Sequence, residues 1–431
     1  MKLHLIDFPL GNNHNLQNTS KIVNLLGVAF IFLTIVLLCY PVLLAYPFSF
    51  IRITTTSQTS SSSVFSSSFC NVSEDSIRVD KKKNKCDFFN GEWILNPDNA
   101  PYYTNETCTA IPDRQNCMKY GKPDSDFMKW RWKPNDCELP IFNPFQFLEL
   151  VQGKSLAFVG DSVGRNQLQS LICLLSRVEY PIDLSNSPEE QSRRWIYTKY
   201  NFTIANFWSP YLVKMSEAER NGPTHTGLFN LYLDEAEDWT TKIDGFDYVI
   251  ISVGHWFFRP SMFYEDNQLV GCYYCLDKNV KNLTVHYGYG KAFRTAFRAI
   301  NSLKNFKGII FLRTLAPSHF ENGEWNKGGN CVRRRPFMNN ETHLDGRELQ
   351  PYLAQVEEFK VAEKEGMKRG LKFRLLDTTQ AMLLRPDGHP SRYGHLPEVN
   401  VTLYNDCVHW CLPGPIDTWN DILLEMLKIE A

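Results

Sequence analysis

The sequence carries no excess of charge of either sign. Its 46 Lys and Arg residues nearly balance 47 Asp and Glu residues, so the formal net charge is −1 at pH 7. Domains that bind nucleic acid usually have a strongly basic face, so the composition gives no reason to expect such a partner. The 43% of hydrophobic and 22% of charged residues are typical of a globular protein with a sizeable core.

The sequence also lacks the signatures of common cofactors and metals. It contains no phosphate-binding loop, no dinucleotide fingerprint and no cluster of carboxylates suited to a metal ion. Cys272 and Cys275 have the spacing of a zinc or redox pair, but no second pair supplies the remaining zinc ligands. We therefore expect a local disulfide there, no metal site and no bound cofactor.

Charge is absent from one long segment near the N-terminus. The stretch from Ile22 to Phe50 is uncharged and long enough to cross a bilayer as a helix. Lys2 and Lys21 precede it and Arg52 follows it, which favours a cytosolic N-terminus and a luminal body. A cleaved signal peptide would have a shorter apolar core nearer the start of the chain. The pattern predicts a single-pass signal anchor of type II topology.

Cysteines and glycosylation sequons agree with this topology. Of 12 cysteines, only Cys39 lies in the apolar segment, and the others follow it. Many cysteines in an exported body indicate disulfides. Six Asn-x-Ser/Thr sequons also lie beyond the segment, at Asn71, Asn105, Asn201, Asn282, Asn340 and Asn400. The body of the protein is therefore expected to be luminal, disulfide-bonded and glycosylated.

Composition divides the chain into five predicted parts. The Ser/Thr-rich stretch after the membrane segment cannot bury enough apolar surface to fold, so it is interpreted as a stem. Cysteines, tryptophans and turn-forming residues dominate the next part, which indicates a loop-rich, disulfide-tied module. The parts are a cytosolic tail (1–21), a transmembrane anchor (22–50), the stem (51–85), a Cys/Trp-rich N-terminal module (86–140) and a large main domain (141–431).

The main domain has the pattern of an α/β fold. Short continuous apolar runs alternate with amphipathic helical stretches, which indicates a mainly parallel sheet covered by helices on both faces. The runs are at 155–159, 248–253, 308–312 and 373–376, and the helical faces are near 293–300 and 352–359. In such a three-layer α/β/α sheet, sites form beyond the carboxyl ends of the strands.

Ser162 follows the first of these runs. Gly160 breaks the strand, Ser162 is expected on a tight turn, and residues 167–175 are predicted as a helix. A hydroxyl on such a corner meets the positive end of the helix, which suits a nucleophile whose attack creates an oxyanion. The alternative is a serine that merely caps the helix.

Asp406 and His409 are the other chemically suggestive pair. One irregular turn can direct both side chains toward a serine, with the carboxylate fixing the imidazole tautomer and the imidazole taking the hydroxyl proton. The alternative is that Asp406 caps a turn and His409 is an ordinary, partly buried histidine. Cys407 and Cys411 flank His409, and we predict that at least one of them is bonded to Cys331 or to a cysteine of the N-terminal module.

Taken together, these motifs resemble a known group of enzymes. The segment 160–167 with Asp406 and His409 resembles the SGNH/GDSL esterase superfamily. More closely, residues 86–431 resemble the plant trichome birefringence-like family of cell-wall polysaccharide O-acetyltransferases, through segments 86–93, 126–132, 160–167 and 406–414. Segments 206–211, 254–259 and 318–325 are most similar to the xyloglucan-acetylating branch of that family.

The resemblance implies a function and an SGNH-hydrolase-like fold for the main domain. It implies transfer of acetyl groups in the Golgi to hydroxyls of a wall polysaccharide, with xyloglucan side-chain galactose as the expected acceptor. A Ser-His-Asp triad of Ser162, His409 and Asp406 would act through an acetyl-serine intermediate. The acetyl donor is not identified by any motif; acetyl-CoA is one candidate, and a membrane partner that supplies acetyl groups is another.

The sequence departs from the wider SGNH pattern at one block. The second apolar run is followed by Gly254-His255-Trp256, where that superfamily has Gly-x-Asn-Asp, so the usual side-chain oxyanion donor is missing. Asn166 and the Ser162 N–H are candidate replacements. Arg165 is predicted to orient a sugar hydroxyl or the loop, with a plain surface arginine as the alternative. The full set of predicted oxyanion and substrate-binding residues is Asp161, Arg165, Asn166, Gly254, Trp256 and Trp410.

Three other functions stay open on the sequence alone. An acetylesterase needs the same triad, with water as acceptor. An O-acetyltransferase for xylan, mannan or pectin differs only in its acceptor groove. A non-catalytic polysaccharide-binding wall protein could use the ten tryptophans for stacking on sugars, but it has no need of a triad.

Overall fold

The computed structural model describes residues 86–98, 100–186, 192–217, 229–275, 277–401 and 403–431. The chain divides into two units, Met1–Lys81 and Lys82–Ala431, and every described residue belongs to the second. The predicted tail, membrane anchor and stem therefore lie outside the described residues. Within the described part of the chain, no helix has the length and apolar character needed to span a membrane.

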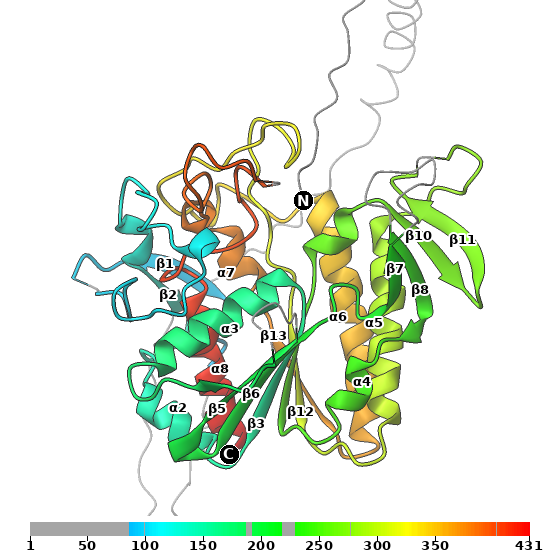
Figure 1. Ribbon diagram of the computed structural model, residues 1–431, viewed down its shortest axis with the longest axis horizontal. Helices are drawn as coiled ribbons and strands as arrows, with labels where there is room; N and C mark the ends of the chain where they lie inside the picture. The colour runs from blue at the N-terminus through cyan, green and yellow to red at the C-terminus, as the bar shows by residue number, and fades with distance from the viewer. Residues whose placement is uncertain (1–85, 99, 187–191, 218–228, 276, 402) are drawn as a thin grey trace, which may run out of the picture. The chain divides into compact units, whose positions relative to one another are not determined.

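A seven-stranded sheet forms the centre of the main domain, with the strand order β13-β12-β9-β3-β6-β5-β4 (Figure 1). The five strands from β13 to β6 are parallel, and β5 and β4 continue the sheet in antiparallel fashion. The mainly parallel sheet predicted from the apolar runs is thus confirmed. The bounds are β3 (Ser155–Gly160), β4 (Ile182–Asp183), β5 (Arg193–Tyr197), β6 (Phe202–Trp208), β9 (Tyr248–Ser252), β12 (Ile309–Arg313) and β13 (Lys372–Leu376).

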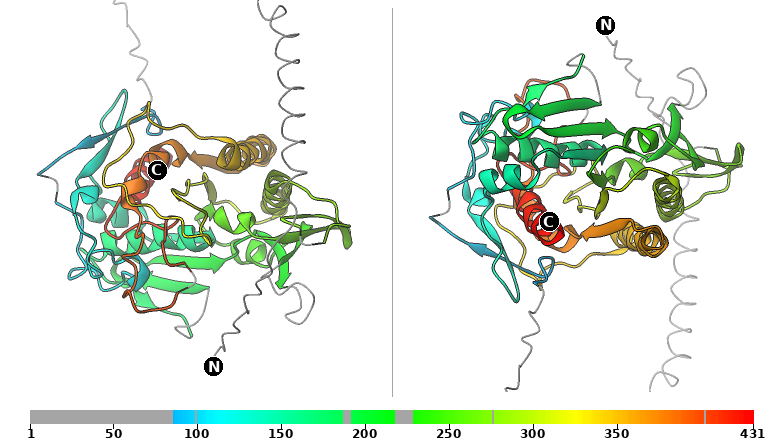
Figure 2. Two further views of the ribbon diagram at one scale, coloured as in Figure 1. Left: turned by 90° about the horizontal axis from the view of Figure 1, so that it is seen from above. Right: turned by 90° about the horizontal axis from the view of Figure 1, so that it is seen from below.

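Helices cover both faces of this sheet because successive strand side chains point to opposite sides. In β3, Leu156 and Phe158 pack into the core under α2, α3 and α8, whereas Ala157 and Val159 pack into the core under α5 and α6. Figures 1 and 2 show these two helical layers on either side of the sheet. The helices are α2 (Pro144–Leu150), α3 (Ser162–Leu175), α4 (Trp239–Lys242), α5 (Val285–Ser302), α6 (Gly346–Met367), α7 (Thr379–Leu383) and α8 (Asp417–Glu430).

A second sheet, which the sequence analysis did not anticipate, lies against α5. It has four strands in the order β11-β10-β8-β7, and β8, with a smaller share from β7, makes the contact with α5. Its bounds are β7 (Val213–Glu217), β8 (Phe229–Ala236), β10 (Ser261–Glu265) and β11 (Gln268–Tyr273). The predicted local bond between Cys272 and Cys275 is present at the end of β11.

The N-terminal module contains a two-stranded antiparallel sheet, β1 (Gly91–Leu95) and β2 (Trp130–Pro134), and otherwise consists of loops and short 3₁₀ turns. It is not a separate body, because its buried side chains share one core with α3 and α8. Two of its three disulfides join it to the main domain. Cys86–Cys137 lies within the module, whereas Cys108–Cys173 joins it to α3 and Cys117–Cys411 joins it to the C-terminal loop.

Hydrogen bonds to buried carboxylates also join the module to α8. The Tyr103 hydroxyl donates to Asp417 at 2.7 Å, and the Tyr102 hydroxyl donates to Asp421 at 2.8 Å. Burial raises the pKa of Asp417 to about 6 and that of Asp421 to about 8. The module therefore braces the helix that follows the predicted catalytic turn.

Candidate active site

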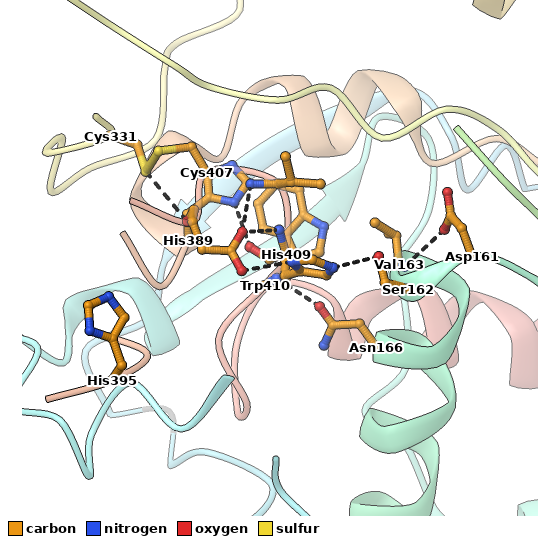
Figure 3. Close-up of polar contacts among 12 residues, drawn as sticks. Asp161, Ser162, Val163, Asn166, Cys331, His389, His395, Cys407, His409 and Trp410 are labelled. Atoms are coloured by element: carbon orange, nitrogen blue, oxygen red, sulfur yellow. Dashed lines mark hydrogen bonds and ion pairs between the residues drawn. A yellow bond between two sulfur atoms is a disulfide. The ribbon is translucent and has the colours of Figure 1, made fainter. Parts of the chain in front are cut away.

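Ser162 is the first residue of α3, directly after the carboxyl end of β3. The helix is capped by Asp161, whose Oδ1 accepts a hydrogen bond from the Val163 N–H at 2.9 Å (Figure 3). Asp161, and not Ser162, is therefore the N-cap, so the Ser162 hydroxyl is not used to cap the helix. The helix starts five residues before the predicted 167–175 segment, so the serine hydroxyl stands at a helix N-terminus, as the nucleophile interpretation requires.

Asp161 also ties two strand ends together. Its Oδ2 accepts a hydrogen bond from the Gly254 N–H at 2.8 Å, just beyond the end of β9. Asp161 is 1% exposed, so its role in the structure is to hold the serine turn rather than to contact a ligand. Gly160 makes this turn possible, because its φ is +156° and a Cβ there would lie 1.9 Å from the Ser252 carbonyl oxygen.

The three predicted triad residues meet in space. His409 Nε2 lies 2.7 Å from Ser162 Oγ, and His409 Nδ1 lies 2.7 Å from Asp406 Oδ2 (Figure 3). Asp406 Oδ1 accepts the backbone N–H groups of Val408 and His409 at 3.1 and 2.9 Å. Burial acts to raise the pKa of Asp406, but the charge and hydrogen bonds of His409 prevail and lower it to about 2. The carboxylate is thus ionised at any physiological pH.

The loop that carries His409 is held from several sides. Disulfides fix it at Cys407, bonded to Cys331, and at Cys411, bonded to Cys117. The prediction that at least one of these cysteines pairs with Cys331 or with the N-terminal module is confirmed, and in fact both do. The His409 carbonyl lies 2.7 Å from Nδ1 of His389, which indicates that this ring nitrogen carries the proton and donates it. These ties limit how far the imidazole can move from the serine.

His389 and its neighbour His319 are support residues that sequence reasoning missed. The ring of His389 stacks on Trp410 at 4.1 Å, and its Nε2 lies 2.7 Å from His319 Nδ1. Burial lowers the pKa of both histidines, that of His319 to about 4. No spacing in the sequence connects either ring to His409, because they approach it from separate loops.

Trp410 does not play the role predicted for it. The sequence analysis placed it as a sugar platform because it adjoins His409, but its side chain is 0% exposed and packs against His389. A ring with no open face cannot stack on a sugar, so we assign Trp410 to the core. Its backbone N–H donates to Asn166 Oδ1 at 2.8 Å, which couples the loop to α3.

Asn166 is buried beneath the site. Its Oδ1 is used by Trp410, its Nδ2 has no partner among the described residues, and it lines neither of the cavities at the serine. This geometry gives Asn166 a positioning role, and its role as an oxyanion donor stays a prediction. The Ser162 N–H, at the start of α3, makes no backbone hydrogen bond in the described structure and remains the better placed donor.

A first cavity of about 470 Å³ opens on one side of Ser162 and His409. Trp256, predicted to contact sugar, lines it, and the Arg259 guanidinium stacks over that ring at 3.9 Å. Other aromatic side chains in its wall are Phe258, Phe320, Trp325 and Phe337. Aromatic faces of this kind suit the apolar faces of sugar rings.

A second cavity of about 520 Å³ is lined by the same two residues and by a different set of neighbours. Arg165 lines it and is held against the ring of Trp208 at 5.0 Å. Arg165 is therefore a wall of the site rather than a plain surface arginine. The serine hydroxyl stands where the two cavities meet, so one nucleophile can be reached from both.

Comparison with known proteins agrees with the architecture. A family model described as the GDSL/SGNH-like acyl-esterase family found in Pmr5 and Cas1p matches residues 139–426, and the PMR5 N-terminal domain matches residues 84–138. Protein trichome birefringence-like 19 of Arabidopsis thaliana is 55% identical over 414 residues, 95% of this chain and 94% of that protein. Xyloglucan O-acetyltransferase 4 of Populus trichocarpa is 46% identical over 355 residues, 82% of this chain and 83% of that protein.

Proposed function

Because the chain belongs to the GDSL/SGNH-like acyl-esterase family found in Pmr5 and Cas1p, we propose that it transfers acetyl groups to hydroxyls of a plant cell-wall polysaccharide. The observation that carries the proposal is the hydrogen-bonded chain Ser162–His409–Asp406 at the junction of two cavities. Relatives named as xyloglucan O-acetyltransferases support xyloglucan as the acceptor, with side-chain galactose as the proposed sugar.

In the first half-reaction, Ser162 takes the acetyl group. Its hydroxyl is a weak nucleophile until His409 Nε2, 2.7 Å away, accepts the proton. Asp406 keeps the imidazole in the tautomer with Nδ1–H and stabilises the imidazolium that forms. The leaving group of the donor departs with the proton from His409, and acetyl-Ser162 remains.

In the second half-reaction, a sugar hydroxyl takes the place of the serine hydroxyl. His409 removes its proton, the oxygen attacks the acetyl carbonyl, and Ser162 regains the proton as the ester is released. Both half-reactions pass through an oxyanion at the same position. The Ser162 N–H at the start of α3 is the proposed donor to it, aided by the positive end of the helix.

The first cavity is proposed as the acceptor side. Its aromatic walls offer stacking faces, and its carboxylates and histidines offer partners for sugar hydroxyls. A polysaccharide acetylesterase would also need a sugar-binding surface, so transfer is preferred because the relatives are named as O-acetyltransferases. A wall-binding protein needs no ordered triad, which makes that alternative the weakest of the three.

The decisive assay compares acceptors. The purified full-length protein is given a labelled acetyl ester with deacetylated oligosaccharides of xyloglucan, xylan, mannan or pectin, or with buffer alone. We expect label on xyloglucan fragments at a rate well above its release to water. Release to water that is unaffected by every oligosaccharide would establish the esterase instead, and a preference for another polymer would reassign the acceptor.

We further propose a Golgi location with the body in the lumen. The uncharged 22–50 segment, the five described disulfides and the sequons beyond the segment support this topology. Glycosidase treatment should increase the mobility of the protein on a gel. Digestion of the main domain by protease added outside sealed Golgi vesicles would contradict the topology.

A further inference from the structure

We propose that the second cavity receives the acetyl donor and that Arg114 and Arg165 bind an anionic, phosphate-type group on the donor's leaving side. This inference rests on the proposed function, because it assigns the two cavities to the two substrates of one transfer reaction. It also names the chemistry of the donor, for which the sequence offers no motif.

Charge distinguishes the two cavities. Three arginines and a single carboxylate line the second one, namely Arg114, Arg165, Arg193 and Asp183, and the last two form an ion pair with each other. The first cavity has the opposite balance, with four carboxylates against two arginines: Glu321, Glu324, Asp345 and Glu348 against Arg259 and Arg347. An anion that approaches the serine is therefore attracted from the side of the second cavity and repelled on the other.

Arg114 and Arg165 lack acidic partners in the described part of the chain. Neither forms a salt bridge or a side-chain hydrogen bond there; Arg165 stacks on the face of Trp208 and feels the charge of Asp161 without pairing with it. Burial lowers the pKa of Arg165, and the nearby charge of Arg114 lowers it further, which shows that the two guanidinium groups are close enough to repel each other. Two neighbouring cations, neither of them paired with a carboxylate among the described residues, form a ready site for phosphate oxygens.

Further polar groups complete the cavity wall. Gln115, which is 3% exposed, follows Arg114 and lines the cavity, and its Oε1 has no hydrogen-bond partner within the described residues. Gln169, one turn of α3 beyond Arg165, also lines the cavity, and its buried Oε1 likewise has no hydrogen-bond partner within the described residues. These two carbonyl oxygens can only accept hydrogen bonds, so an ionised phosphate cannot satisfy them, but an N–H or O–H group elsewhere on the donor molecule would.

The anion is assigned to the donor because the proposed acceptor is a neutral sugar and has its own aromatic cavity. As Ser162 Oγ bonds to the acetyl carbon, the bond from that carbon to the leaving atom breaks, and His409 passes the serine proton to the leaving atom. The arginines change no bond in this step. They hold the phosphate-bearing part of the leaving group, and its release empties the cavity before the sugar attacks.

The test measures acetylation of Ser162 in the full-length protein by anionic and neutral donors. Acetyl-CoA and acetyl phosphate carry phosphate groups, whereas p-nitrophenyl acetate offers the same acetyl group without charge. Arg114→Gln and Arg165→Gln are compared with Arg298→Gln, an exposed arginine on α5 in the opposite helical layer. We expect kcat/KM for at least one anionic donor, relative to that for p-nitrophenyl acetate, to fall about tenfold or more in the two site variants. The control should keep the wild-type ratio.

Two further outcomes separate the claims. If p-nitrophenyl acetate fails to acetylate wild-type Ser162, or if the acetyl group never reaches an oligosaccharide, the proposed function fails before the arginines are considered. If both steps proceed but the donor ratio is unchanged in the arginine variants, the donor site is wrong. If the arginine variants instead raise KM only for an oligosaccharide that bears uronic acid, the donor site is also wrong, because the second cavity would then bind an acidic acceptor.

Discussion

Removal of the disulfide between Cys117 and Cys411 should destabilise the protein strongly while leaving much of its activity. The bond links the N-terminal module to the loop that carries His409, across a sequence separation of 294 residues. The chain-entropy model gives about 6 kcal/mol for a loop of this size. The bond between Cys272 and Cys275 closes a separation of only 3 residues, for which the model gives about 2 kcal/mol.

Activity should suffer less than stability, because other contacts hold the loop. The Cys411 N–H donates to the Gly388 carbonyl and the Leu412 N–H to the Gln115 carbonyl, both at 2.9 Å. The second disulfide, at Cys407, also remains. We therefore expect kcat to stay within roughly tenfold of wild type when it is measured well below the unfolding midpoint.

The assay compares two double variants made in the same way. Cys117→Ala with Cys411→Ala should lower the thermal midpoint by roughly 10 °C, and Cys272→Ala with Cys275→Ala by much less. Alanine avoids burying a new hydroxyl at Cys411, which is 0% exposed. Equal losses in the two double variants would refute the reasoning, because they would show that loop length does not determine the stabilisation.

Three further predictions concern single residues. Asp421 keeps a proton in the folded protein up to about pH 8 that the unfolded chain releases near pH 4, so the free energy of unfolding should fall as the pH rises between these values. Asp421→Asn should remove this fall and raise the free energy of unfolding at pH 7 by up to about 4 kcal/mol, as measured by denaturant titration. A pH profile of stability that the substitution leaves unchanged would contradict this prediction. Asp406→Asn should lower kcat about 10⁴-fold with an unaltered circular dichroism spectrum; a loss below tenfold would remove Asp406 from the triad. The ring of Trp325 lines the first cavity and is 41% exposed, so Trp325→Ala should raise KM for xyloglucan oligosaccharides more than it slows acetylation of Ser162. An unchanged KM would show that the acceptor binds elsewhere.

The sheet could be predicted because its strands are buried on both faces. The run 155–159 became β3 (Ser155–Gly160), and the run 308–312 became β12 (Ile309–Arg313), each shifted by one residue at most. Parallel strands covered on both sides have continuous apolar sequences, which a single chain reveals. The strand β8 was missed because its residues alternate between buried and partly exposed and so form no continuous apolar run of the kind that identified the other strands.

The sequence analysis placed the start of α3 too late in the chain. The sequence analysis placed Ser162 on a turn before the helix, whereas the structure needs a glycine at position 164, because a Cβ there would lie 2.9 Å from the Ser252 hydroxyl oxygen. The helix can therefore begin at Ser162 and pack closely on the end of β9. Close approach between segments far apart in the chain has no signature in a single sequence.

The partners within the site were predictable only in part. Ser162, His409 and Asp406 were identified by motif, and the structure brings them into hydrogen-bond contact. The burial of Trp410 was not predictable, because it depends on His389 and on a loop fixed by tertiary contacts. A bond from Cys407 or Cys411 to Cys331 or to the N-terminal module was predicted, but the fold was needed to show which cysteine pairs with which.

The most direct test of the proposed chemistry is the mass of the peptide that contains Ser162 after the full-length protein is incubated with an acetyl donor and no acceptor. The mechanism predicts one acetyl group on Ser162, which disappears when xyloglucan oligosaccharide is added and never forms in Ser162→Ala. An acetyl group on a different residue, or near-normal transfer by Ser162→Ala, would contradict the central claim that the hydroxyl held by His409 carries the acetyl group.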